Sequence, residues 1–235
     1  MTIDVHQAAL AFGQELQDLL DAVLPKPWNV DEHDRQVQVL AGAQNRYSIR
    51  VAHRHGLIAL VRNGEHVASL RVEYRCTHDT SKDYLAVQQS SFELRSAADR
   101  TPLARLDYLR NAHTVPAAHW NVYAERGAVS HLLGRTNQDH SGLVSKLHFT
   151  VGGSRMRPCL EDFIDFIAYE FRFDLRSGAK AALAEGRERW RRKQIRALVR
   201  DAPEEAVQAL TALNYTVIDP AEGPRQPNTK SLRSP

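Results

Sequence analysis

Residues 57–76 read LIALVRNGEHVASLRVEYRC, and this stretch decides the fold. The apolar run 57–62 leads into Asn63-Gly64, a pair that favours a type I′ turn because both central residues need positive φ. After the turn, apolar residues alternate with polar ones: Ala68, Leu70, Val72 and Tyr74. A period of two places successive side chains on opposite faces of a strand. The stretch therefore predicts a β-hairpin with one apolar and one polar face.

The same alternation extends from about residue 46 to 151. It predicts further strands at 47–51, 84–95, 103–109, 117–124 and 146–151. The alternation slips between Gln88 and Ser91, which indicates a β-bulge. Short strands joined by polar turns favour a mainly antiparallel sheet, here of about six or seven strands.

Helical periodicity is found on both sides of the predicted sheet. Residues 4–24 carry an apolar stripe and end at Pro25, and core packing is favoured over a short coiled-coil seam. The segment from Pro158 predicts a helix that covers the sheet with Leu160, Phe163, Ile164, Ile167 and Phe171. A basic helix is predicted at 178–200, and a short one after Pro203 with Val207 and Leu210 inward. The fold class is therefore α+β.

The domain organisation follows from this order of elements. Residues 1–175 form an α+β domain, and 176–218 form a helical extension packed on it. Residues 219–235 are polar and contain proline, which predicts a disordered tail.

Composition excludes several classes of protein. The chain has 235 residues, 43% hydrophobic and 25% charged, as in an ordinary globular protein. It has no apolar run of about 20 residues and no signal-peptide pattern at its start. Its two cysteines, Cys76 and Cys159, form neither a disulfide framework nor a zinc pattern. We expect a cytoplasmic protein without a membrane partner, cofactor or metal.

Positive charge is concentrated in residues 187–200, which read RERWRRKQIRALVR. This segment has a net charge of +6, whereas the whole chain has +3, so the rest carries 3 − 6 = −3. Such a helix can bind the phosphates of nucleic acid, here through Arg187, Arg191, Arg192, Lys193 and Arg196. The alternatives are a solvated helix face, or one that docks on an acidic surface of the same chain or of a partner.

A second polar pattern lies on two of the predicted strands. His119, Asn121 and Tyr123 share one face of 117–124, and Lys146 and His148 share one face of 146–151. If the strands are neighbours, His119, His148, Lys146 and Tyr123 are candidate catalytic residues. One histidine would take a proton and the other would donate one, as in metal-independent phosphodiester cleavage. The alternatives are a polar sheet face exposed to solvent, or a metal site completed by Asp107 or Glu125.

The turn after residue 151 is the third candidate. Gly152 and Gly153 allow close approach of a ligand, and Arg155 and Arg157 precede the helix at Pro158. The start of a helix favours an anion, so these four residues are candidate phosphate ligands. The alternative is a structural connection whose arginines pair with Glu161 or Asp162.

The segment LHFTVGGSRMRPCLEDFIDFI, at 147–167, resembles a stretch of uncharacterised actinobacterial proteins. The looser resemblance covers about residues 105–171, including RLDY and HWNVYAE, and it implies no activity. HFTV at 148–151 also looks like half of the H-x-[ST] signature of two-histidine phosphoesterases. The second half is missing, because Ser69 stands one place too late after His66.

These patterns together predict a protein that acts on or binds phosphate-containing ligands, with nucleic acid as the first choice. A metal-independent ribonuclease of toxin or phage-defence type fits the same residues. The alternative is a non-catalytic module for protein interaction or homodimerisation.

Overall fold

The computed structural model describes residues 4–26, 35–52, 56–79, 84–97, 102–112, 115–124, 143, 145, 149–152 and 157–233. Its elements begin with helix α1 (Val5–Val23), strand β1 (Val37–Ala41) and the 3-10 turn η2 (Ala43–Asn45). The strands β2 (Tyr47–Val51), β3 (Leu57–Arg62), β4 (Glu65–His78), β5 (Leu85–Ser96), β6 (Pro102–Leu109), β7 (Ala118–Val122) and β8 (Phe149–Gly152) follow. The helices α3 (Leu160–Phe171), α4 (Ala179–Asp201), α5 (Pro203–Ala212) and α6 (Thr229–Arg233) come last.

The eight strands form one sheet in the order β1-β2-β4-β5-β6-β7-β8, with β3 paired to β4. Each of these pairs is antiparallel, so the predicted α+β class is confirmed. The predicted hairpin is present, with φ of 52° at Asn63 and 80° at Gly64. Strand β1 was not predicted, because VQVLA is short and Leu40 interrupts its alternation.

The predicted bulge lies in β5 at Gln88. Arg75 pairs with Gln89 but Cys76 pairs with Val87, so Gln88 is the extra residue. Its carbonyl accepts a hydrogen bond of 2.8 Å from the backbone N–H of Arg110, just beyond the end of β6. The carbonyl of the extra residue is thus hydrogen-bonded to the chain beyond the neighbouring strand, and this bond fixes the position of the Arg110 backbone.

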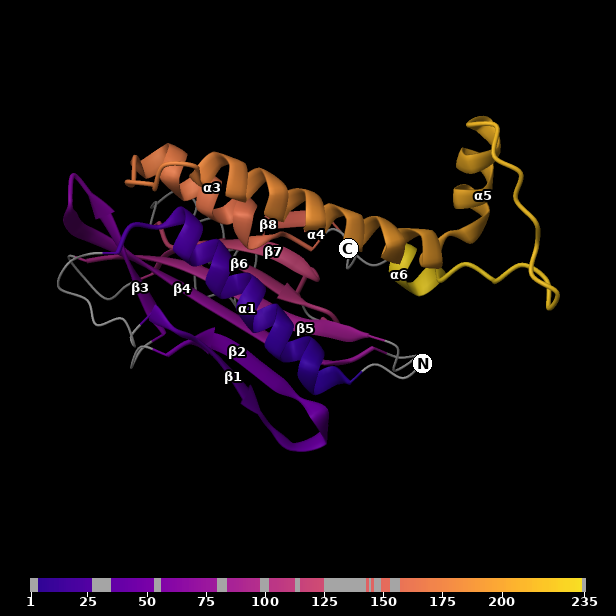
Figure 1. Cartoon of the computed structure of the whole chain (residues 1–235), viewed down its shortest axis with the longest axis horizontal. Helices are drawn as coiled ribbons and strands as arrows, with labels where there is room; N and C mark the ends of the chain where they lie inside the picture. The colour runs from indigo at the N-terminus through magenta and orange to yellow at the C-terminus, as the bar shows by residue number, and fades with distance from the viewer. Residues whose placement is uncertain are drawn as a thin grey trace.

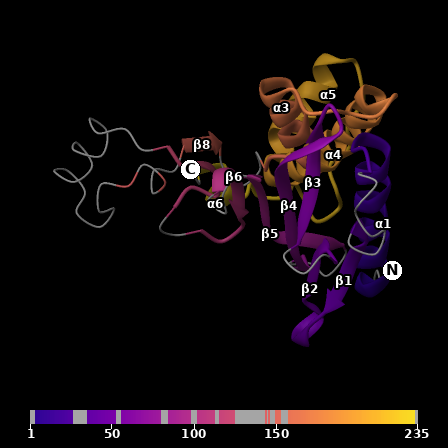
Figure 2. The same cartoon turned by 90° about the vertical axis from the view of Figure 1, so that its left-hand side faces the viewer.

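Helices α1, α3 and α4 all lie on one face of the sheet (Figures 1 and 2). The predicted core residues Leu160, Phe163, Ile164 and Ile167 of α3 are at most 1% exposed. Phe171 was predicted to be buried, and this is wrong: it is 47% exposed. The helix ends at Arg172, where φ is 56°, and the buried Phe173 takes the core position while Phe171 stacks on it.

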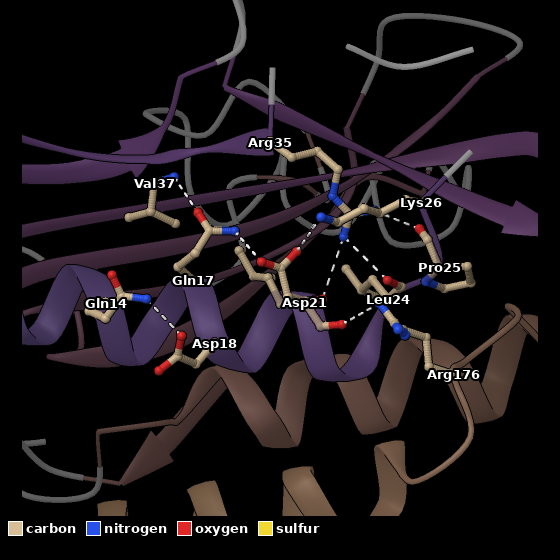
Figure 3. A network of polar contacts seen from close by, with 11 residues as sticks. Gln14, Gln17, Asp18, Asp21, Leu24, Pro25, Lys26, Arg35, Val37 and Arg176 are labelled. Carbon is tan, nitrogen blue, oxygen red and sulfur yellow. Dashed lines mark hydrogen bonds and ion pairs between the residues drawn. The ribbon is translucent and has the colours of Figure 1, made fainter. Parts of the chain in front are cut away.

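The C-terminal end of α1 is fixed by a network of polar contacts (Figure 3). Arg35 is 5% exposed and donates to the carbonyls of Leu20, Leu24 and Pro25 at 3.5, 3.3 and 2.6 Å. The carbonyl of Leu20 also accepts the N–H of Leu24 at 3.0 Å, whereas those of Leu24 and Pro25 lie beyond the last helical hydrogen bond. The guanidinium therefore caps the helix in the manner that its dipole favours. Burial lowers the pKa of Arg35, although Asp21 opposes this effect. Gln17 also accepts from the N–H of Val37 at 2.7 Å, which ties α1 to β1.

Helix α4 has the basic sequence predicted for 178–200, and it packs against α3 at Gly186. A Cβ built on Gly186 would lie 2.3 Å from a carboxylate oxygen of Glu161, so only glycine fits without moving that side chain. Beyond α4, helix α5 stands away from the body of the molecule (Figure 1). Val207 and Leu210 were predicted to point inward, and this is wrong: they are 36% and 40% exposed.

The structure describes the C-terminal segment up to residue 233. It includes α6, which the sequence did not predict, and Asn228 donates to the carboxylate of the buried Asp201 at 3.2 Å. None of the described helices combines the length and the apolar character that crossing a bilayer requires.

Candidate functional site

The basic residues of α4 point in different directions and have different partners. Arg187 binds Asp162 and Asp165 on α3, and Arg191 lies 3.9 Å from Asp162. Arg192 pairs with Glu188 one turn away at 2.6 Å. Three of the five residues predicted to bind nucleic acid therefore face carboxylates of α3 or of their own helix. This arrangement matches the alternative in which the basic helix docks on an acidic surface of its own domain.

The remaining two, Lys193 and Arg196, face a cavity between α1, α4 and the sheet. The cavity has a volume of about 480 Å³, and we call it the α4 cavity. Cationic side chains are its most prominent feature: Arg110, Arg157, Lys193, Arg196 and Arg200. Among the described residues that line it, the only carboxylate is Glu15 of α1, which gives a formal lining charge of 5 − 1 = +4. Excess positive charge therefore gathers in one hollow of the molecule.

Aromatic side chains form much of the apolar part of the same wall: Phe12, Tyr84, Tyr108 and Trp190. The guanidinium of Arg157 lies 3.8 Å from the centre of the Trp190 ring, a cation–π contact. The carbonyl of Arg157 accepts from Nε1 of Trp190 at 3.2 Å, so the two residues are held together at both ends. Arg200 similarly lies 4.8 Å from the ring centre of Tyr84 and donates to its hydroxyl at 3.1 Å.

The charge of Arg157 persists at neutral pH although its surroundings oppose it. Burial is the main cause that lowers its pKa, to about 10, and the cation of Arg110 acts in the same direction. A guanidinium with this pKa is protonated at pH 7 and has lost part of its hydration. An anion that enters the cavity would stabilise both cations at once.

Arg157 was predicted to bind phosphate at the start of α3, and the structure places it elsewhere. Its side chain turns toward Trp190 of α4, while the first turn of α3 carries Glu161 and Asp162. Those two acidic residues already complement the helix dipole. Gly152 ends strand β8, and Gly153 and Arg155 lie outside the described residues.

A second polar cluster lies on the opposite face of the sheet. Asp107 accepts from Ser91 at 2.7 Å, from Arg105 at 2.7 Å and from Asn121 at 3.0 Å. We call these residues together with His119 the Asp107 network. Asp107, His119 and Asn121 are only 7%, 3% and 2% exposed. The alternative of a polar face exposed to solvent is therefore wrong for these three side chains.

His119 has both of its ring nitrogens directed at other protein groups. Nδ1 donates to the carbonyl of Pro116 at 2.7 Å, and Nε2 lies 3.9 Å from the carboxylate of Asp107. A general acid or base needs a nitrogen within hydrogen-bond reach of the substrate. This geometry favours a structural role for His119. The pairing of His119 with His148 and Lys146 stays a prediction, because the latter two lie outside the described residues.

Tyr123, the other candidate catalytic residue, follows β7 on the same face and is partly buried. The burial of Arg105 disfavours its charged form, but Asp107 and Tyr123 outweigh this effect and raise its pKa. The described residues include no group of three or more metal-ligating side chains, and Glu125 lies outside them.

Sequence reasoning missed most of the residues that give the α4 cavity its character. Tyr84, Tyr108, Arg110, Trp190 and Arg200 come from three different elements or their ends, and no local motif connects them. One signal was available: Trp190, Lys193, Ala197 and Arg200 recur at spacings of three and four, which places them on one face of a helix.

Comparison with protein-family models, with curated proteins and with solved structures finds no match for this chain. The two polar clusters are therefore the features of the described structure that bear on function.

Proposed function

We propose that this protein binds phosphate-containing ligands, nucleotides in particular, in the α4 cavity. The observation that supports this is the lining of one hollow by four arginines and a lysine with a single carboxylate. A volume of about 480 Å³ lies within the usual range for small-molecule sites. Arginine matches the geometry of phosphate oxygens, and aromatic rings can stack against a base.

Charge balance favours this cavity over the other polar regions of the molecule. Lys193 forms an ion pair of 3.0 Å with Glu15, so the lysine and the carboxylate largely cancel. The four arginines that remain are Arg110, Arg157, Arg196 and Arg200. An unbalanced group of cations in a hollow raises the local concentration of anions, because low-dielectric walls focus the field. A dianionic phosphate fits that field better than a carboxylate does.

The test is a titration with adenosine 5′-monophosphate in which binding is measured by calorimetry. We expect binding of the nucleotide, and binding of adenosine at least tenfold weaker, because the phosphate makes the main contact. The substitution Arg196→Glu should weaken nucleotide binding by at least tenfold, about 1.4 kcal/mol. Arg192→Glu is the matched control: Arg192 lies on the same helix, is paired with Glu188 and does not line the cavity.

Two outcomes would contradict the proposal. One is an equal loss of affinity in Arg192→Glu and Arg196→Glu, which would mean that the general charge of the helix binds the ligand. The other is equal affinity for adenosine and its phosphate ester.

A second candidate function is homodimerisation, and the exposed apolar residues of α5 favour it. Leu210, Leu213 and Tyr215 are 40%, 68% and 63% exposed, and α5 has no buried residue. An isolated helix of 10 residues is marginal in water, so α5 needs a partner surface. Residues 203–223 carry four acidic residues and no lysine or arginine, whereas 187–200 has a net charge of +6. We propose that α5 of one copy packs on α4 of a second copy.

Sedimentation velocity tests this second candidate. The wild-type chain should dimerise at micromolar concentration, and Leu210→Glu with Leu213→Glu should be monomeric. Leu10→Glu is the control, because Leu10 is similarly exposed, at 41%, but lies on α1. A wild-type chain that stays monomeric at 100 micromolar, about the upper range for a specific weak contact, would rule the dimer out.

A further inference from the structure

A second cavity lies at the end of the sheet where β1 and β2 meet. Its volume is about 800 Å³, and we call it the hairpin cavity. It is lined by the β1–β2 connection, by β4 at 75–77, by the bulge of β5 and by the end of β6. Its cations are Arg46, Arg75 and Arg110, and no carboxylate is among the described residues that line it.

Arg110 belongs to both cavities. The bulge at Gln88 explains how this happens: residues 84–87 line the α4 cavity, and Gln88 and Gln89 line the hairpin cavity. The hydrogen bond from the N–H of Arg110 to the carbonyl of Gln88 places the arginine at this boundary. The linings of the two cavities therefore share one cation, which can contact an anion in either.

The two linings differ in a way that suits two parts of one polymer. The α4 cavity offers aromatic rings, whereas the hairpin cavity offers side-chain amides and hydroxyls: Gln44, Gln88, Gln89, Asn111, Ser48 and Thr77. Proteins bind single strands by stacking bases on aromatic rings, hydrogen bonding to base edges and following the backbone with cations. The described residues that line the two cavities include seven cations and one carboxylate, and one of these cations, Arg75, also pairs with Glu73 at 3.4 Å.

We propose that a single-stranded oligonucleotide runs from the α4 cavity into the hairpin cavity and passes a phosphate over Arg110. This inference rests on the proposed nucleotide site and extends it from a mononucleotide to a short polymer. A duplex does not fit this assignment, because its bases are stacked and paired and cannot reach the rings or the amides.

The experiment measures affinity against length, using fluorescein-labelled oligoadenylates of two, four and eight nucleotides and fluorescence anisotropy. The wild-type chain should bind the octamer at least tenfold more tightly than the dimer, with a steeper salt dependence, because more phosphates are neutralised. The substitution Arg46→Glu should remove most of that gain and leave dimer binding within twofold. Arg50→Glu is the matched control, an exposed arginine of β2 that lines neither cavity.

The outcomes separate this inference from the proposed function. Affinity that does not rise with length, or a gain that survives Arg46→Glu, would overturn the path through the hairpin cavity and leave the nucleotide site standing. If adenosine 5′-monophosphate does not bind while octamer affinity still depends on both Arg46 and Arg196, the path stands and the mononucleotide function fails. Equal affinity for an eight-base-pair duplex would overturn the single-strand assignment. Parallel titrations with oligodeoxyadenylates distinguish RNA from DNA as the source of the strand.

Discussion

The α4 cavity and the Asp107 network are both rich in charged and polar side chains, but they differ in balance. Asp107 accepts hydrogen bonds from Ser91, Arg105 and Asn121. The described residues that line the α4 cavity include five cations and one carboxylate, and that carboxylate pairs with Lys193. The polar groups of the Asp107 network are paired with one another, whereas the described lining of the α4 cavity has an excess of positive charge.

The difference shows why residue types alone do not identify a site. His, Tyr, Asn and Lys predicted on neighbouring strands are the residue types of a ribonuclease site, and a run of arginines is the residue type of a nucleic-acid surface. Buried polar groups are normally hydrogen-bonded within the protein, so a satisfied network is the expected state. An unbalanced cluster in a hollow is the exception, and it points to a ligand.

The largest expected effect concerns the core that lies under both regions. Phe163 is fully buried, and its ring centre lies 5.6 Å from that of Trp120 and 5.9 Å from that of Phe92. Phe163→Ala should lower the free energy of unfolding by about 3–5 kcal/mol, measured by urea denaturation. A loss below about 1 kcal/mol would mean that α3 does not pack on the sheet through this face.

The next effect distinguishes the two polar regions directly. Asp107→Ala should lower the free energy of unfolding by about 2–3 kcal/mol, because it leaves Asn121 and Arg105 without their acceptor. This loss is smaller than that for breaking a fully buried ion pair, because the Arg105 side chain is 35% exposed and can be rehydrated. Nucleotide affinity should stay within twofold of the wild-type value. The comparison breaks down if Asp107→Ala abolishes binding and leaves stability intact.

The next substitution should have a smaller effect, and it should strengthen nucleotide binding. Glu15→Gln removes the one carboxylate of the α4 cavity and releases Lys193, so affinity for adenosine 5′-monophosphate should rise by about two- to fivefold. Glu188→Gln is the control, since Glu188 pairs with Arg192 away from the cavity. Unchanged or weaker binding in Glu15→Gln, measured by calorimetry at low salt, would show that the phosphate does not sit near Lys193.

The smallest effect concerns a buried thiol beneath the cavities. Burial raises the pKa of Cys76 to about 12, so the thiol stays neutral in the folded chain while the unfolded chain ionises near pH 8.5. Its contribution to stability is complete below that pH and is lost as the pH rises toward 12. Between pH 8 and 9 the loss is about 0.7 kcal/mol.

Urea denaturation at the two pH values measures this, with Cys76→Ala as the variant that should have the shallower dependence. Labelling of the native chain by a disulfide reagent at pH 8 should also be slow, because Cys76 is 2% exposed. Rapid labelling of Cys76 would show that the sheet and its helices separate readily.

Local patterns predicted most of the fold. The hairpin at Asn63-Gly64, the slip near Gln88 and the stripe of α3 each depend on residues close in sequence, and all three are present. Strand β1 was not predicted, because its five residues, with one break in the alternation, show too little periodicity. The exposure of Phe171 depends on where α3 ends, and the sequence does not mark that point with glycine or proline.

The candidate site could be predicted only in part. Lys193, Arg196 and Arg157 were predicted to bind phosphates, but on separate surfaces. That they share a cavity depends on α4 crossing α1 and on the side chain of Arg157 turning toward Trp190. Such contacts join residues that are far apart in the chain, and periodicity carries no information about them. The alternation of 117–124 was read correctly, but it did not reveal that the polar face of this strand is buried.

The pairing of the first helix with one of the last has a consequence for biosynthesis. Glu15 of α1 meets Lys193 of α4, so about 180 residues must be translated between the two halves of this contact. At about 5–20 residues per second, that takes roughly 10 to 40 seconds. Throughout this interval the apolar stripe of α1 lacks one of the surfaces that later cover it. A nascent chain arrested before α4 should therefore recruit chaperones through its first 24 residues, and the α4 cavity should be among the last features of the molecule to form.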